Sequence, residues 1–137
     1  MNKIENIKIF IVDDSVFCRN LYKQHLKNLR INDIHVFEDG EQCMRALLDT
    51  QIKPDVILMD FDMPPTNGLE IISRIRSVNT NQMVVMISSQ GSIQVAVDAM
   101  KYGVLDYIIK DGSELDRLTV AINSVLENKI HRQMAVS

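Results

Sequence analysis

The sequence has few cysteines and no long apolar run. Its 137 residues include only Cys18 and Cys43, without CxxC spacing, so they make no disulfide framework. No apolar run approaches the roughly 20 residues that span a bilayer, and the N-terminus lacks the charged and apolar regions of a secretory signal. We therefore expect a cytoplasmic chain with no membrane insertion.

A basic stripe is also missing. The net charge is −3, and the lysines and arginines are spread along segments of helical period. Nucleic-acid-binding proteins usually carry clustered positive charge, so we expect no direct contact with nucleic acid. The three histidines, His25, His35 and His131, show no ligand spacing.

What is present is the composition of one globular domain. Apolar residues make up 46% of the chain and charged residues 24%, and the length suits a single domain. There is no linker, repeat or low-complexity segment. We expect one domain over residues 1–137, with its core at about 7–128 and a short polar tail at 131–137.

Short apolar runs alternate with segments of helical period, which is typical of βαβ units and a parallel sheet covered on both faces. The predicted strands are 7–12, 33–37, 55–60, 82–87 and 104–109. The predicted helices are 15–29, 40–50, 68–77, 92–102 and a last one from about Ser113. This pattern predicts an α/β, flavodoxin-like (βα)₅ fold, a doubly wound sheet with strand order 2-1-3-4-5.

Chemically active side chains follow four of these strands. Asp13 and Asp14 follow the first strand and Asp60 ends the third, whereas Ser88 follows the fourth and Lys110 the fifth. The carboxyl ends of parallel strands share one edge of the sheet, where ligands bind. We therefore expect three carboxylates, a hydroxyl and an ammonium group to meet at one site.

The carboxylates indicate a hard cation. Without one they repel each other, and at least one pKa should rise. Oxygen ligands suit Mg²⁺, and we expect Asp14 and Asp60 as direct ligands, with Asp13 mostly through water. A carboxylate can also attack phosphorus and form an aspartyl phosphate. Asp60 would be that nucleophile, with Lys110 and Ser88 contacting phosphoryl oxygens.

These residues carry a family resemblance. The chain resembles the receiver domain of a two-component response regulator, the single-domain chemotaxis type included, over about residues 7–128. The motifs that carry the resemblance, in chain order, are Asp13-Asp14, Asp60, Met63-Pro64, Gly68, Ser88, Ala99-Met100-Lys101-Tyr102-Gly103, Asp106-Tyr107 and Lys110. Each motif is weak alone, but all of them in this order and spacing are specific.

The resemblance implies a role for each site residue. Asp60 would accept a phosphoryl group from a histidine kinase or phosphotransfer protein, while Asp13, Asp14, Asp60 and the backbone carbonyl of Asp62 would bind Mg²⁺. Lys110 and Ser88 would contact the phosphoryl group. The domain would catalyse only its own phosphorylation and dephosphorylation, and so would not be an enzyme acting on other substrates.

The resemblance also implies a switch. Ser88 would move toward the phosphoryl group and Tyr107 would swing inward. The face formed by the fourth helix, fifth strand and fifth helix would then change its preference for a downstream protein. A dimer through that same face is a further expectation.

Two features depart from the family pattern. Asp111 follows Lys110 where many receivers have proline, so the peptide bond there is expected to be trans, or cis under strain. The side chain of Asp62 adds negative charge near the expected phosphoryl position, and we predict an effect on the rate of dephosphorylation, of either sign.

Other functions compete with this interpretation. Asp13 and Asp14 would cap the first helix in a purely structural reading. The chain could also be a receiver-like docking module that is never phosphorylated. Asp60-Phe61-Asp62 matches the start of an aspartate-nucleophile phosphatase motif, but Pro64 departs from it and there is no cap domain. In a flavin carrier, the acidic pair would repel the FMN phosphate.

Overall fold

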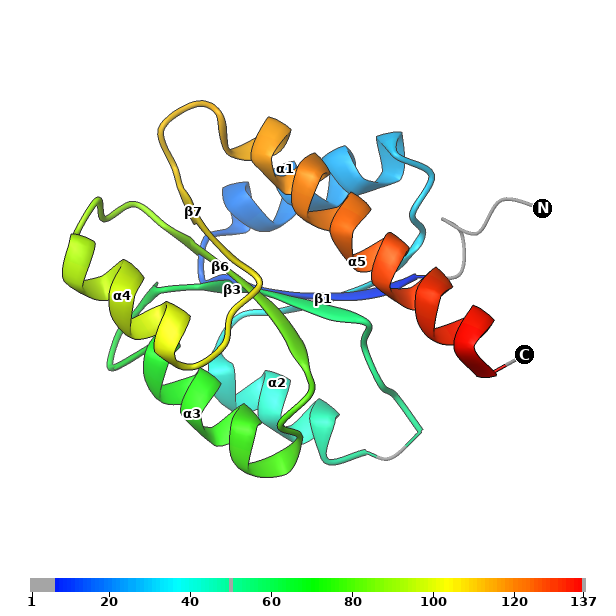
Figure 1. Ribbon diagram of the computed structural model, residues 1–137. Coiled ribbons are helices and arrows are strands. Elements are labelled where there is room, and N and C mark those ends of the chain that lie inside the picture. Colours follow the sequence, from blue (N-terminus) through cyan, green and yellow to red (C-terminus); the bar gives the residue numbers. More distant parts are fainter. Residues whose placement is uncertain (1–6, 50, 137) are drawn as a thin grey trace.

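The computed structural model describes residues 7–49 and 51–136, which form a three-layer α/β domain (Figure 1). The strands are β1 (Lys8–Val12), β2 (Asp33–Phe37), β3 (Val56–Asp60), β4 (Asp62–Met63), β5 (Thr66–Asn67), β6 (Met83–Ser88) and β7 (Asp106–Ile109). The helices are α1 (Val16–Asn28), α2 (Gly40–Leu47), α3 (Gly68–Val78), α4 (Ile93–Lys101) and α5 (Glu114–Val136).

The main sheet has the order β2-β1-β3-β6-β7, and all its pairs are parallel. Counting only these five strands, this is the predicted order 2-1-3-4-5, so the predicted fold is confirmed. The register places Asp60 beside Ile87 and Ser88 beside Ile109. The polar ends of three neighbouring strands are therefore aligned along one edge of the sheet.

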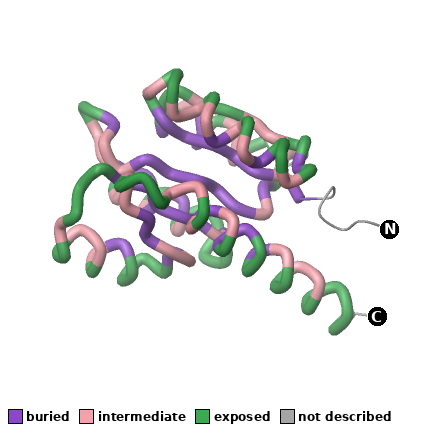
Figure 2. Tube along the Cα trace, turned by 90° about the horizontal axis from the view of Figure 1, so that it is seen from above, coloured by how far each residue is buried: buried purple, intermediate pink, exposed green. Residues whose placement is uncertain are grey.

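Each face of the sheet has its own hydrophobic core. The helices α1 and α5 cover one face, and α2, α3 and α4 cover the other (Figure 1). All five residues of β3 are buried, and Figure 2 shows the buried strands between the two helical layers. Typical core members are Ile9, Tyr22, Leu26, Leu118 and Val125 on the first face, and Phe10, Ile57, Met59, Ile72 and Ala99 on the second.

Side-chain caps begin four of the helices. The capping residues are Ser15 for α1, Asp39 for α2, Asn67 for α3 and Ser92 for α4. Such caps satisfy backbone N–H groups that have no partner within the helix. The residue that caps α1 is therefore Ser15 and neither member of the preceding acidic pair.

Two details of the structure differ from the sequence-based expectations, and a third answers the question of the peptide bond after Lys110. Residues 131–136 continue α5 as a helix instead of forming a tail, and residues 131–135 are exposed (Figure 2). The predicted loop around Pro64 holds a short antiparallel ladder of β4 and β5. Within the described chain the cis peptide bond is Pro64–Pro65, so the bond after Lys110 is trans. No helix in the described residues is long and apolar enough to cross a membrane.

Candidate functional site

An acidic cluster lies at the carboxyl edge of the sheet. Asp13 and Asp14 come directly after β1, and Asp60 is the last residue of β3, which pairs with β1. One carboxylate oxygen from each of the three lies within 4.8 Å of the others. Asp13 and Asp60 are buried, at 1% and 3% exposure, whereas Asp14 is exposed. The cluster is thus a mostly buried group of anions with one exposed member.

Lys110 supplies the positive charge of the site. Its Nζ lies 3.3 Å from Asp13 Oδ2 and 3.4 Å from Asp60 Oδ1. The backbone N–H of Lys110 donates to the carbonyl of Ser88 at 2.8 Å, which fixes the end of β7 against β6. Burial alone would lower the pKa of Lys110, but the carboxylates of Asp13 and Asp60 outweigh it and raise the pKa above its usual value.

The environment of Asp60 disfavours its ionised form. Its burial, followed by the negative charge of Asp13, raises the pKa of Asp60 from 3.8 to about 6, although Lys110 and the N–H of Asp62 act in the opposite direction. Lys110 Nζ and the Asp62 N–H both bond to Oδ1. Oδ2 therefore has no hydrogen bond to a described residue, and it is the oxygen available to a metal ion or an electrophile.

Residues that the sequence did not single out support the cluster. Arg19 donates from its guanidinium to the backbone carbonyl of Asp13 at 2.8 Å, and the Ser15 N–H donates to Asp13 Oδ1 at 2.9 Å. The Cys18 sulfur lies 3.7 Å from Lys110 Nζ. Cys18 and Arg19 lie in the first turn of α1, so the start of this helix holds the backbone of Asp13 and lies beside Lys110.

The two expected switch residues lie on neighbouring strands. Ser88 is fully buried at the end of β6, and its Oγ accepts a bond from the Gln90 N–H at 3.0 Å. Tyr107 on β7 is 8% exposed, and its hydroxyl donates to the carbonyl of Gln90 at 2.7 Å. The tyrosine that the resemblance expects to swing inward therefore already lies inward in this structure.

The Asp62 side chain is held by the loop between β6 and α4. Ser89 Oγ donates to Asp62 Oδ2 at 2.8 Å, and Gln90 Nε2 donates to Asp62 Oδ1 at 3.1 Å. Sequence reasoning noticed the charge of Asp62 but missed Gln90. No motif marks a lone glutamine two residues past a strand-end serine, so only the folded geometry reveals the contact.

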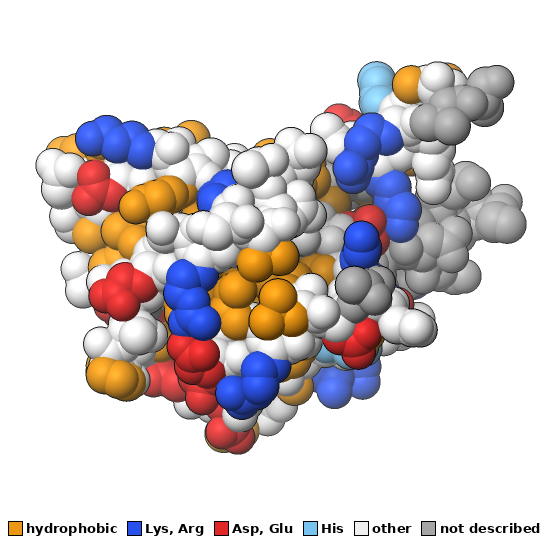
Figure 3. Space-filling model, turned by 90° about the horizontal axis from the view of Figure 1, so that it is seen from below, with side chains coloured by type: hydrophobic (Ala, Val, Ile, Leu, Met, Phe, Trp, Pro, Cys, Tyr) orange, Lys and Arg blue, Asp and Glu red, His pale blue; other side chains and the backbone are white. Residues whose placement is uncertain are grey.

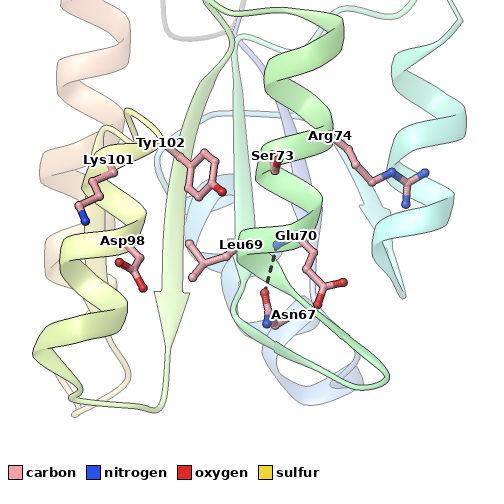
Figure 4. A pocket seen from close by; sticks show the side chains of 8 residues that line it. All are labelled: Asn67, Leu69, Glu70, Ser73, Arg74, Asp98, Lys101 and Tyr102. Carbon is pink, nitrogen blue, oxygen red and sulfur yellow. Dashed lines mark hydrogen bonds between the residues drawn. The ribbon is translucent and has the colours of Figure 1, made fainter.

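Other surface hollows lie away from the acidic cluster. A groove of about 630 Å³ runs between α3 and α4, with Leu69 and Tyr102 in it and charged side chains such as Asp98 and Lys101 around it (Figure 4). Apolar side chains also reach the surface between α2 and α3, where Leu48 and Val78 are exposed. Figure 3 shows such apolar areas framed by charged side chains. Neither hollow contains the acids of the cluster.

The fold and this site define a class of signalling domain. The family model of the response regulator receiver domain matches residues 9–123. The chain therefore belongs to the response regulator receiver family of two-component systems, as its motifs predicted. Receiver domains are signalling domains.

Individual relatives agree with this assignment. The chain is 32% identical to the chemotaxis protein CheY of Listeria monocytogenes over 117 residues, covering 85% of this chain and 95% of CheY. It is 30% identical to the regulatory protein LuxO of Vibrio cholerae over 116 residues, which is 85% of this chain but 25% of LuxO. A CheX–CheY–BeF₃–Mg complex from Borrelia burgdorferi superposes with a TM-score of 0.79, 28% identity and coverage of 87% and 88%.

Proposed function

We propose that this chain is a phosphoryl-accepting receiver in which Asp60 is the acceptor. The observation that carries the proposal is the meeting of Asp13, Asp14 and Asp60 within 4.8 Å, with Lys110 Nζ bridging two of these acids. A docking module has no need of this arrangement, because repelling buried carboxylates cost stability unless a cation or an incoming group uses them.

The residues present fit Mg²⁺. Three carboxylates with one exposed member offer hard oxygen ligands and leave room for water. Burial and the charge of Asp13 raise the pKa of Asp60, so a divalent cation beside it would favour the ionised carboxylate. Asp13, Asp14, Asp60 and the backbone carbonyl of Asp62 would hold the ion. When bound, it would supply positive charge to neutralise phosphoryl oxygens. The similar Borrelia CheY complex contains both BeF₃ and Mg.

The proposed step transfers a phosphoryl group from a phosphohistidine of a histidine kinase or phosphotransfer protein. A carboxylate oxygen of Asp60 forms a bond to phosphorus, the bond between phosphorus and the imidazole nitrogen breaks, and that nitrogen keeps the electron pair and takes up a proton. Lys110 lies 3.4 Å from Asp60 and stabilises the charge on the group in transit. Ser88, at the end of the neighbouring strand, donates a hydrogen bond from its hydroxyl to an oxygen of the phosphorylated product.

The output face in this proposal is α4, β7 and α5. Tyr107 lies on β7, and α4 exposes the apolar side chains of Ile93, Val97 and Met100. A phosphoryl group can change partner preference only by its difference in interaction energy between two arrangements of this face. A downstream protein or a second copy of the chain would bind there. As the target of a kinase, the chain would act in the cytoplasm.

The first prediction tests the acceptor. Incubation with acetyl phosphate and Mg²⁺ should add about 80 Da to the intact protein, the mass of one phosphoryl group, as seen by mass spectrometry. The Asp60→Asn variant should gain nothing, and peptide mapping should locate the group on Asp60. Beryllofluoride with Mg²⁺ should bind the native protein with one equivalent and leave the variant unbound.

The alternatives give other results. An aspartate-nucleophile phosphatase would release many equivalents of inorganic phosphate without a lasting mass gain. A docking module that is never phosphorylated would neither gain mass nor bind beryllofluoride. Either outcome would overturn the proposed function.

A further inference from the structure

Gln90 is the point at which three parts of the site meet. Its N–H donates to Ser88 Oγ at 3.0 Å, and its carbonyl accepts from the Tyr107 hydroxyl at 2.7 Å. Its side-chain Nε2 donates to Asp62 Oδ1 at 3.1 Å. One residue between β6 and α4 is therefore bonded to the end of β6, to the tyrosine on β7 and to the acid two positions past Asp60.

Both oxygens of the Asp62 carboxylate accept a hydrogen bond from this loop. Oδ1 accepts from Gln90, and Oδ2 accepts from Ser89 Oγ at 2.8 Å. Hydrogen bonds to an ionised carboxylate are shorter and stronger than those between neutral groups. The two bonds join β4, just past Asp60, to the β6–α4 loop, although these segments are 27 and 28 residues apart in the chain.

The position of Tyr107 depends on the same residue. Its ring is almost completely buried, and its hydroxyl bonds to the backbone of Gln90. An outward movement of the ring breaks that bond, and a displacement of Gln90 removes the acceptor. Whatever holds the Gln90 side chain in place therefore also favours the inward ring.

We propose that Asp62 and Gln90 form a positioning pair that holds Tyr107 inward before any phosphoryl group is present. The pair places the Gln90 carbonyl where the tyrosine hydroxyl reaches it. For its signalling consequence this inference rests on the proposed function. A receiver whose tyrosine is already inward has less conformational change left for phosphorylation to drive, so its partner affinity differs less between the two states.

The test observes Tyr107 directly in the unphosphorylated protein. The chain has three tyrosines, Tyr22, Tyr102 and Tyr107, so labelling with 3-fluorotyrosine gives three ¹⁹F resonances that single Tyr→Phe variants assign. In the native chain, beryllofluoride and Mg²⁺ should shift the Tyr107 resonance only slightly. In Gln90→Glu, where two carboxylates face each other, the resonance should move toward its position in the unfolded chain, and beryllofluoride should return it.

Exchanging the two groups separates positioning from a general loss of structure. The double variant Asp62→Asn with Gln90→Glu restores one amide and one carboxylate in reversed order, and its Tyr107 resonance should return toward the native position. Gln94→Glu is the matched control. Gln94 Nε2 also donates to an acid, Asp98, at 2.8 Å, but no hydrogen bond to Tyr107 runs through it in the described residues, so this variant should leave the Tyr107 resonance unchanged.

Two results would overturn the inference. One is a Tyr107 resonance in unphosphorylated Gln90→Glu that matches the native one, with circular dichroism confirming that both are folded. The other is a double variant no closer to native than Gln90→Glu. Neither result requires phosphorylation, so failure of this inference is distinguishable from failure of beryllofluoride to bind at Asp60, which would count against the proposed function.

Discussion

At the scale of the single residue, Asp60 is held in a state that costs stability. Its pKa is about 6 in the folded chain, against 3.8 for an unperturbed side chain. A difference of this size corresponds to about 3 kcal/mol between the protonated and ionised forms. Because the folded state binds the proton more tightly than the unfolded chain, ionisation of Asp60 reduces the stability as the pH rises from about 4 to about 6, and the full cost is present above that range.

The second prediction follows from the loss of stability that ionisation of Asp60 causes as the pH rises. Without divalent ions at pH 7.5, Asp60→Asn should be more stable to urea than the native chain by about 1–3 kcal/mol. The difference should shrink as the pH falls and vanish below about pH 4. Mg²⁺ should stabilise the native chain at pH 7.5 and the variant much less. Equal urea midpoints for both proteins at pH 7.5 would contradict the account.

The third prediction concerns Lys110, the cation that the cluster already has. In Lys110→Ala, Asp13 and Asp60 lose the ammonium group that lies within 3.4 Å of both, so their repulsion is relieved only by a metal ion. The variant should bind Mg²⁺ more tightly than the native chain in isothermal titration calorimetry, yet be phosphorylated more slowly by acetyl phosphate. Weaker Mg²⁺ binding would show that Lys110 shapes the site and does not compete with the ion. Lys101→Ala on α4 is the control.

At the scale of the element, the start of α3 is fitted closely to the end of β3. A Cβ on Gly68 would lie 2.7 Å from the carbonyl oxygen of Asp60 and 3.0 Å from Cα of Phe61. Both are backbone atoms and cannot rotate away. The glycine therefore lets the helix begin directly against Asp60, the proposed acceptor.

The fourth prediction uses this fit. Gly68→Ala should lower the free energy of unfolding by about 1–3 kcal/mol, as expected for overpacking, and should slow phosphorylation because the Asp60 backbone must shift. Urea titration and the acetyl phosphate assay measure the two effects. Gly91→Ala is the matched control, since a Cβ there has no neighbour within 4 Å, and it should change the stability little. A Gly68→Ala chain with native stability and native rate would show that the loop yields at little cost.

The sequence predicted these elements well where the pattern was local and periodic. The apolar runs ending in Asp13, Asp60 and Lys110 identified the strands, and parallel pairing then required their ends to meet. The end of α5 was misjudged because residues 131–137 look polar. Leu126, Ile130 and Met134 nevertheless continue the helical spacing of four, and the helix extends through Val136.

Contacts between loops were less accessible to sequence reasoning. The bonds of Gln90 to Asp62 and Tyr107 join segments separated by 28 and 17 residues, and the groups involved occur in any polar loop. The inward ring of Tyr107 has the same origin, since its burial depends on where the β6–α4 loop lies. The roles of the site residues remain proposals that the experiments above address.

At the scale of the whole molecule, exposed apolar side chains gather on α4. The helix α4 exposes Ile93 at 81% and Met100 at 55%, and these side chains lie beside Val97 in a shallow apolar hollow. Large apolar side chains grouped on a surface commonly mark an interaction site. This hollow belongs to the proposed output face.

The fifth prediction tests whether a second copy binds there. In sedimentation velocity the native chain should show a larger dimer fraction with beryllofluoride and Mg²⁺ than without them. Val97→Glu should abolish that increase by placing a charge in the apolar contact, while still binding beryllofluoride. A chain that stays monomeric in both conditions would exclude the dimer and leave this face to a different protein.

The central position of β3 has a practical consequence. Asp60 ends a strand that is buried throughout and paired on both sides, whereas Ser89 and Gln90, which bond to the side chain of Asp62, lie on an exposed connection. The proposed acceptor is thus held by a buried strand, whereas the loop that bonds to Asp62 is open to solvent. Because the charge of Asp62 is expected to affect dephosphorylation, substitutions at Ser89 and Gln90 offer a way to vary the lifetime of the proposed phosphorylated state without altering any buried residue.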